Sequence, residues 1–441
     1  MALAEAAFST PEMVSVFSGE NQVRQMLAFE AALAQAEARV GVIPSAAADA
    51  IGAVRVENLD LDGLFEQAVP AGTLTIPLVR QLGQRVTDEG TKYVHWGATS
   101  QDAMDTGLVL QVRQALDLLD SDLLRLGSIC ADLAERHRRT LMPGRTLLQQ
   151  ALPITFGLKA ARWLGLVARQ LPAVREIRPR VLVVQFGGAA GTLASLGADG
   201  LRVLDCLAAE LGLAAPELPW HAERDRVASL AACLGVVAGG MAKIAGDVVL
   251  MAQTEVLEVA EAAAPGKGGS STLPQKRNPV YAVEALAAAR LAVGLVPVVL
   301  AAMHQEHERA AGGWQAEWSA VPDLFRWTSG AVARTCSALS GLEVFPDRMQ
   351  ANLDEMAMSE SLSMALAAHV GKEQAHSLLQ SVTRRALSSG QSLREAALQE
   401  QGVRSALDER TIDQALDPQN YLGATDAFID RSLTAWRALT G

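Results

Sequence analysis

Cysteine is scarce in this sequence of 441 residues, and its four copies are far apart. They form no CxxC pair, which argues against a zinc or redox motif and against a disulfide framework. The cysteines are Cys130, Cys206, Cys233 and Cys336. Basic residues are also outnumbered, since 38 Lys and Arg face 49 Asp and Glu for a net charge of −11. This balance disfavours nucleic acid as a partner, although a local cation cluster can still bind an anionic substrate.

Long apolar runs and targeting segments are also missing. The N-terminal MALAEAAFSTPEM has no basic region followed by an apolar stretch, so we expect no secretory signal. One apolar uncharged stretch, 227–242, is about 16 residues long and contains glycines. That is short for a membrane span, so we interpret it as a buried helix. We therefore expect a cytoplasmic protein without a membrane partner.

Two segments suggest cofactor or metal sites, but neither has the required spacing. VLVVQFGGAAG at 181–191 has glycines spaced GGxxG rather than GxGxxG, which favours a short strand and a close-packing turn. HQEHE at 304–308 does not follow the HExxH order of zinc peptidases, and a charged surface fits it better. We expect neither a nucleotide nor a metal in these places.

Most of the sequence shows apolar residues at helical spacing, and we therefore predict an all-α fold. Apolar residues spaced by threes and fours form one stripe of a long helix, at Leu108, Val112, Ala115, Leu119, Leu123, Leu126, Cys130 and Leu133. The segment 283–303 is apolar nearly all round, which predicts burial on every side. We divide the chain into three domains: 1–106 with short helical patterns broken by Gly and Pro, 107–345 with long helical patterns, and 346–441, which is shorter and more charged. A helix bundle with apolar outer faces predicts a homo-oligomer.

Three polar clusters interrupt this helical pattern. The first is a Gly- and Pro-rich loop at 266–280, GKGGSSTLPQKRNPV, with hydroxyl, ammonium and amide groups at Ser270, Ser271, Lys276 and Asn278. Backbone N–H groups of such a loop form anion-binding nests, so the loop suits a carboxylate beside a serine. A solvated loop between helices would account for the same composition.

The second cluster, HWGATSQDAMDT at 95–106, precedes a helix that we expect to start at 107. Thr99, Ser100 and Gln101 suit a carboxylate-binding turn, whereas Asp102 and Asp105 are equally well explained as helix N-caps. The third cluster is GRTLLQQALP at 144–153, with polar Arg145, Thr146 and Gln149 in an apolar context. Arg145 suits a fork to a substrate carboxylate or, equally, a structural ion pair.

Together the three clusters resemble the fumarase/adenylosuccinate lyase superfamily. GSSTLPQKRNP at 269–279 is similar to the superfamily signature GSSxMPxKxNP, with Leu273 in place of Met. The other two clusters match its first and second conserved regions, in the family's order. The resemblance implies a three-domain, nearly all-α fold with a central long-helix bundle. It also implies a homotetramer in which each active site combines the three motifs from three subunits, with no metal or organic cofactor.

The same resemblance implies the roles of individual residues. It places Ser270, Ser271, Lys276 and Asn278 in catalysis, and it places the substrate against Thr99, Ser100, Gln101, Arg145, Thr146 and Gln149. Within the superfamily, segments 75–82, 144–157 and 305–318 are similar to the branch of cycloisomerases that close carboxylated muconates to lactones. The expected substrate is therefore a small tricarboxylate.

One departure from the family pattern bears on the leaving group. Fumarases and adenylosuccinate lyases usually have His directly after Gly-Arg-Thr, where this chain has Leu147. An amine or hydroxide leaves poorly unless it is protonated, whereas a carboxylate, with a reference pKa of about 4, needs no acid. Leu147 therefore favours the lactone-forming branch over an adenylosuccinate- or argininosuccinate-type lyase.

Two further hypotheses fit the superfamily. A cycloisomerase for a related diene, such as 3-sulfomuconate, would carry nearly the same motifs, because one oxyanion replaces another in the substrate. The superfamily also includes lens crystallins, which are structural proteins. The intact Ser270, Lys276 and Asn278 argue against such a non-catalytic role.

Overall fold

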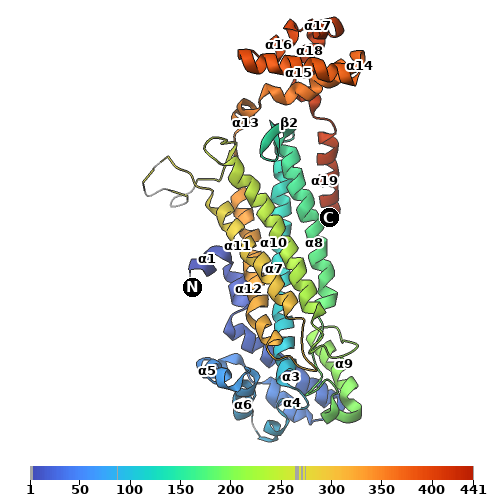
Figure 1. Ribbon diagram of the computed structural model, residues 1–441. Helices are drawn as coiled ribbons and strands as arrows, with labels where there is room; N and C mark the ends of the chain where they lie inside the picture. The colour runs from blue at the N-terminus through green and yellow to red at the C-terminus, as the bar shows by residue number, and fades with distance from the viewer. Residues whose placement is uncertain (1–2, 87, 264–267, 270–271, 274, 441) are drawn as a thin grey trace. The chain divides into compact units, whose positions relative to one another are not determined.

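The computed structural model describes residues 3–86, 88–263, 268–269, 272–273 and 275–440. Nearly all of its regular structure is α-helical, as predicted, and its four strands form two small antiparallel sheets (Figure 1). Its longest helices are α7 (Ser100–Arg136), α8 (Phe156–Val181), α10 (Asp225–Met251), α11 (Val280–Ala301) and α12 (Gly313–Leu339).

The chain forms two compact units, each assembled from separate segments. Unit 1 comprises Met1–Leu123, Gln170–Lys243 and Glu284–Thr335, and unit 2 comprises Leu124–Arg169, Ile244–Val283 and Cys336–Gly441. The three domains predicted from the sequence, with boundaries at 106 and 345, are continuous ranges, whereas each compact unit combines separate segments. The three-domain division therefore remains a prediction.

Unit 1 contains the short N-terminal helices and parts of the long ones. Its shorter elements are α1 (Leu3–Phe8), α2 (Pro11–Val16), α3 (Gly19–Val40), α4 (Ser45–Gly52), η1 (Val56–Asn58), α5 (Leu61–Ala71), α6 (Thr75–Arg85), η2 (Asp88–Tyr93), η3 (Ala194–Asp199) and α9 (Gly200–Leu211). Polar bonds join its long helices: Arg175 Nε donates to Asp120 at 2.6 Å, Gln170 Nε2 donates to the carbonyl of Val236 at 3.0 Å, and Arg334 pairs with Glu284 at 3.0 Å.

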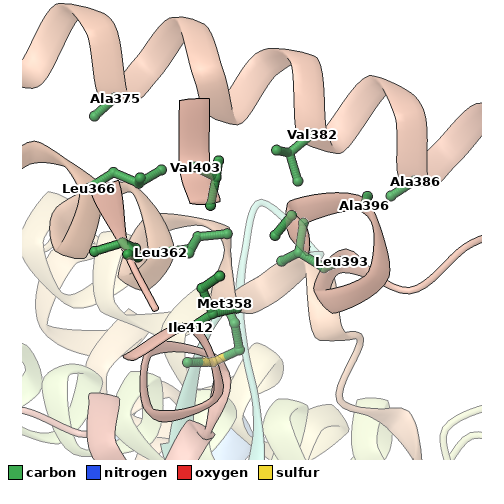
Figure 2. Close-up of a cluster of buried hydrophobic side chains, with 12 residues drawn as sticks. Met358, Leu362, Leu366, Ala375, Val382, Ala386, Leu393, Ala396, Val403 and Ile412 are labelled. Atoms are coloured by element: carbon green, nitrogen blue, oxygen red, sulfur yellow. The ribbon is translucent and has the colours of Figure 1, made fainter. Parts of the chain in front are cut away.

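Unit 2 contains both sheets and the C-terminal helices. Its elements are β1 (Leu141–Thr146), β2 (Gln149–Thr155), β3 (Val259–Ala260), β4 (Glu343–Val344), α13 (Pro346–Asn352), η4 (Glu355–Met358), α14 (Ser359–Val370), α15 (Lys372–Ser389), α16 (Leu393–Gln399), α17 (Gln401–Ala406), α18 (Glu409–Leu416), η5 (Pro418–Tyr421) and α19 (Thr425–Thr440). Apolar side chains of its C-terminal helices, among them Leu362, Leu366, Val382 and Leu393, point into one buried cluster (Figure 2).

The predicted apolar stripe of the first long helix is confirmed. From Val112 to Leu133, every residue of the stripe is at most 3% exposed. The helix begins at Ser100, however, and not at 107 as predicted. Asp102 explains the earlier start, because its carboxylate accepts the N–H of Thr99 at 3.0 Å and so satisfies a donor at the helix N-terminus.

Helix α11 is not buried on every side in the single chain. Its apolar side chains Val283, Leu291, Val293, Val298 and Leu300 are between 39% and 51% exposed. By length and composition, α10 and α11 would suffice to cross a membrane, and 56% and 28% of their most apolar stretches are buried in the chain. Core helices of bundle proteins meet this criterion equally, so it gives weak evidence for a membrane span.

We predict that Gly127→Ala destabilises unit 2. A Cβ at Gly127 would lie 2.1 Å from Cη2 of Trp436, whose indole packs α19 against α7. Overpacking of this kind costs roughly 1–3 kcal/mol, so the thermal unfolding midpoint should fall. The matched control is Gly165→Ala, where the nearest atom to the new Cβ is the flexible end of Arg169 at 3.4 Å. Equal midpoints for the two variants would contradict this packing.

Candidate active site

The first motif forms a turn that leads into the N-terminus of α7. Gly97 has a φ of 72°, and a Cβ there would lie 2.9 Å from Leu196, so glycine is required twice over. Thr99 and Ser100 follow and are half-buried. The carbonyl of Ser100 accepts the hydroxyl of Thr75 at 3.0 Å. The turn therefore places two hydroxyl side chains beside a helix N-terminus, where the dipole favours anions.

Asp102 holds this turn in place. Its fully buried carboxylate accepts N–H groups from Thr99, Gln185, Gly187, Gly188 and His221, at distances from 2.7 to 3.2 Å. The GGxxG segment is thus a close-packing turn whose N–H groups meet a carboxylate. His221, 3% exposed, serves as a structural donor at 2.7 Å. Neither feature was assigned a partner from the sequence.

Gln101 is completely buried, and its amide is fully engaged. Its nitrogen donates to Asp105 Oδ2 at 3.1 Å and to the carbonyl of His221 at 2.9 Å, and its oxygen accepts Arg309 Nε at 3.1 Å. Arg309 also donates to the carbonyl of Ala189 at 3.1 Å. Arg309 is not among the site residues predicted from the sequence. The structure places this cation beside the first motif.

A buried charge network lies one helical turn further along α7. Arg224, 1% exposed, donates to Asp105 at 2.7 and 3.2 Å, and its Nε donates to Glu317 at 3.1 and 3.2 Å. Trp314 Nε1 adds a bond to Asp105 at 3.0 Å. Burial raises the pKa of Glu317, against the opposing effect of Arg224. Asp105 is thus a network member rather than a helix N-cap.

Two further acidic side chains of α3 are buried in the same unit. Glu30 lies 2.6 Å from Nδ1 of His95. Burial lowers the pKa of His95, but the charge and hydrogen bond of Glu30, with the charge of Asp102, outweigh it and raise the pKa. Glu37 is fully buried, and neither of its oxygens has a partner among the described residues. Burial, with the charge of Glu30, raises the pKa of Glu37 to about 9.

The second motif is a β-hairpin whose strands β1 and β2 pair Thr146 with Gln149. The turn between them consists of Leu147 and Leu148, at φ values of 51° and 66°. A left-handed conformation costs a leucine roughly 1–2 kcal/mol. These leucines are also 98% and 72% exposed. The hairpin tip thus combines a strained backbone with two exposed apolar side chains.

Arg145 forms a fork, but with a carboxylate of the chain itself. Its two terminal nitrogens donate to the fully buried Glu258 at 2.9 and 2.6 Å. This geometry favours the structural ion pair over direct substrate binding. Thr146 and Gln149 are exposed beside the hairpin tip.

The signature loop is described only in part, because Ser270 and Ser271 lie outside the described residues. Asn278 closes its base, since its side-chain and backbone nitrogens donate to the carbonyl of Gly268 at 3.0 and 3.1 Å. Lys276 is exposed, and its N–H donates to the carbonyl of Leu273 at 3.1 Å. These four catalytic assignments remain predictions.

The structure thus groups the predicted residues by unit. Thr99, Ser100 and Gln101 come together in unit 1, next to Arg309. The hairpin and the described part of the signature loop belong to unit 2. Over the described ranges, no group of three or more His, Cys, Asp or Glu side chains is arranged to hold a metal ion. In the HQEHE segment, Glu306 instead accepts the N–H of Ala311 at 3.0 Å.

Comparison with known proteins agrees with the motifs. Residues 5–294 match a family model described as lyase, and residues 355–432 match one described as adenylosuccinate lyase C-terminus. A 3-carboxy-cis,cis-muconate cycloisomerase of Pseudomonas aeruginosa is 48% identical over 99% of this chain and 97% of its own length. One from Bradyrhizobium diazoefficiens is 46% identical over 96% of each chain. The crystal structure of 3-carboxy-cis,cis-muconate lactonizing enzyme from Pseudomonas putida matches over 100% of both chains, with a TM-score of 0.95 and 43% identity.

We predict that Glu37→Gln stabilises the protein in a pH-dependent way. The folded state keeps the Glu37 proton up to a pKa of about 9, while the unfolded chain releases it near 4.5. Wild-type stability therefore falls as pH rises between these values, by about 1.4 kcal/mol per pH unit. The variant lacks this loss, so its advantage should be about 3 kcal/mol at pH 7 and near zero at pH 4.5. Unfolding followed from pH 4.5 to 8 would show it, with exposed Glu66→Gln as the control. A pH-independent difference would contradict a buried neutral carboxyl.

Proposed function

Because the chain belongs to the fumarase/adenylosuccinate lyase superfamily, we propose that it is a cycloisomerase that closes 3-carboxy-cis,cis-muconate to 4-carboxymuconolactone. This is a step of protocatechuate breakdown through the β-ketoadipate pathway. The observation that favours this reaction over others of the superfamily is Leu147. It stands where the amine- and water-releasing members have a histidine, within a chain similar over its full length to cycloisomerases.

The reaction joins one carboxylate of the substrate to its own diene. A carboxylate oxygen adds to the carbon β to a second carboxylate, and the carbon–carbon π electrons move toward that second carboxylate. The resulting aci-carboxylate takes one proton at its α-carbon, which completes a five-membered lactone. Holding the attacking oxygen near the carbon supplies part of the rate, and fixed cations and N–H donors stabilise the developing charge.

The reverse step explains why leucine suffices at position 147. Opening the lactone expels a carboxylate, whose reference pKa of about 4 makes it a good leaving group without a proton donor. An amine or hydroxide needs an acid at this point. Leu147 offers none, and its exposed, strained position at the hairpin tip suits an apolar contact with the substrate diene.

The proposed catalytic groups lie in the signature loop. Ser270 is the proton donor to the α-carbon, and Ser271, the next residue in the sequence, assists it. Lys276 and Asn278 hold the carboxylate that takes up the charge. A serine is a weak acid at its ordinary pKa, so Ser270 requires activation by its surroundings.

The proposed substrate-binding groups come from the other two motifs. Thr99 and Ser100 face a carboxylate at the N-terminus of α7, and Thr146 and Gln149 contact the substrate from the hairpin. Gln101 and Arg145 are assigned a structural role and no direct contact with the substrate. The amide of Gln101 is bonded to Arg309 and Asp105, and the guanidinium of Arg145 is bonded to Glu258. We add Arg309 as a substrate-binding cation, since Gln101 fixes it beside the first motif.

The active protein is proposed to be a cytoplasmic homotetramer with each site shared between subunits. The exposed apolar face of α11 supports this, because a single chain leaves those valines and leucines in water. Helices from other copies of the chain would cover that face in a common bundle. The exposed leucines of the hairpin tip would likewise lie inside a neighbour's site.

Loss of the conjugated diene tests the proposed function. Purified protein with 3-carboxy-cis,cis-muconate and EDTA should remove the diene absorbance rapidly and yield a lactone by NMR. Adenylosuccinate and argininosuccinate serve as comparison substrates, and 3-sulfomuconate tests a related cycloisomerase. Turnover of the succinates without loss of the carboxymuconate diene would overturn the assignment.

Ser270→Ala should reduce turnover by at least ~100-fold, because it removes the proton donor. The thermal unfolding midpoint should change little, since the substitution deletes one hydroxyl from a loop. Thr272→Ala, two residues along the same loop, is the matched control and should retain turnover within about threefold. Retained activity in Ser270→Ala would remove this serine from the mechanism.

A further inference from the structure

Two buried glutamates flank the two-residue strand β3 and connect the hairpin and the signature loop to the same support. Glu258 precedes the strand and is 0% exposed, and Glu261 follows it and is 6% exposed. The strand pairs with β4, and the carbonyl of Glu258 accepts the N–H of Phe345 at 3.0 Å. This places the backbone of 258–261 in a fixed register.

Glu258 anchors the hairpin from both of its strands. Its carboxylate accepts the two Arg145 bonds from β1 and a third from Asn352 Nδ2 at 3.1 Å. Asn352 in turn accepts Gln150 Nε2 from β2 at 2.7 Å through its carbonyl. The side chain of Gln150 also accepts the N–H of Asp354 at 3.1 Å. The hairpin is therefore tied to one carboxylate directly through β1 and indirectly through β2.

Glu261 anchors the exit of the signature loop. Its carboxylate accepts the N–H groups of Tyr281 and Ala282 at 3.3 and 2.8 Å, which caps the start of α11. Its carbonyl accepts Arg277 Nη2 at 2.9 Å. Arg277 also pairs with Glu343 of β4 at 2.6 Å. The loop thus ends on the same small sheet on which the hairpin depends.

Glu258 and Glu261 stand at the two ends of this short strand, so they serve different partners from one segment. We propose that residues 258–261 are a positioning element, in which Glu258 sets the hairpin with its substrate-binding Thr146 and Gln149, and Glu261 sets the exit of the loop, which carries Lys276 and Asn278. The proposal rests on the proposed function for those roles. Both carboxylates are engaged by groups of the chain itself, so neither glutamate is assigned a contact with the substrate.

The two positioning residues should affect different kinetic constants. Glu258→Gln weakens the Arg145 fork and loosens substrate binding, so KM for 3-carboxy-cis,cis-muconate should rise about tenfold with kcat within about threefold. Glu261→Gln loosens the loop exit that carries Lys276 and Asn278, the proposed holders of the developing charge, so kcat should fall about 30-fold with KM within about threefold. Glu255→Gln, an exposed change in the same segment, is the matched control and should match wild type.

Hydrogen–deuterium exchange gives a readout that does not depend on turnover. Exchange should increase in 141–155 for Glu258→Gln and in 275–285 for Glu261→Gln, each without the other. Asn352→Ala, which removes the 3.1 Å bond to Glu258, should repeat the Glu258→Gln pattern if that variant fails to fold. A wild-type protein inactive on the diene would overturn the proposed function, while the exchange pattern would still decide the positioning. Parallel changes in both regions, or the same change of kcat and KM in both variants, would overturn the positioning element.

Discussion

The buried carboxylate that accepts several N–H donors is the interaction on which the rest of this structure depends. Asp102 fixes the first motif, and Glu258 fixes the hairpin. A buried carboxylate is costly unless its oxygens are paired, so each of these sites forms only when distant segments supply their donors. The same requirement makes the motifs rigid, because a displaced donor leaves a charge unpaired in a low dielectric.

Rigidity of this kind suits the proposed reaction. Lactone formation needs no general acid at the leaving oxygen. Most of its catalysis comes from placing a carboxylate against a diene and from cations near the developing charge. Leu147 and the buried carboxylates Asp102 and Glu258 are consistent with catalysis by positioning. In the proposed mechanism the chain has an apolar tip in place of a reactive histidine, and its buried charged residues position the motifs.

The helical pattern of apolar residues made the general fold predictable. The ion pairs between residues far apart in the sequence could not be predicted in this way. The apolar residues from Leu108 to Leu133 recur at helical spacing on one face, and this pattern directly predicts α7. The start of α7 was missed because a single bond from Thr99 to Asp102 decides it. Arg224, Arg309 and Glu258 find partners about 90 to 210 residues away along the chain, and nothing local signals them. The motifs themselves were visible because family resemblance, rather than periodicity, identifies them.

The most direct test of the account is the product formed in D₂O, followed by NMR. Carboxylate addition followed by protonation from Ser270 requires a lactone with one deuterium, at a single face of the carbon α to the activating carboxylate. A lactone without deuterium, or with deuterium on both faces, would contradict protonation by a fixed group. A product from which a carboxylate fragment has been eliminated would contradict cycloisomerisation itself.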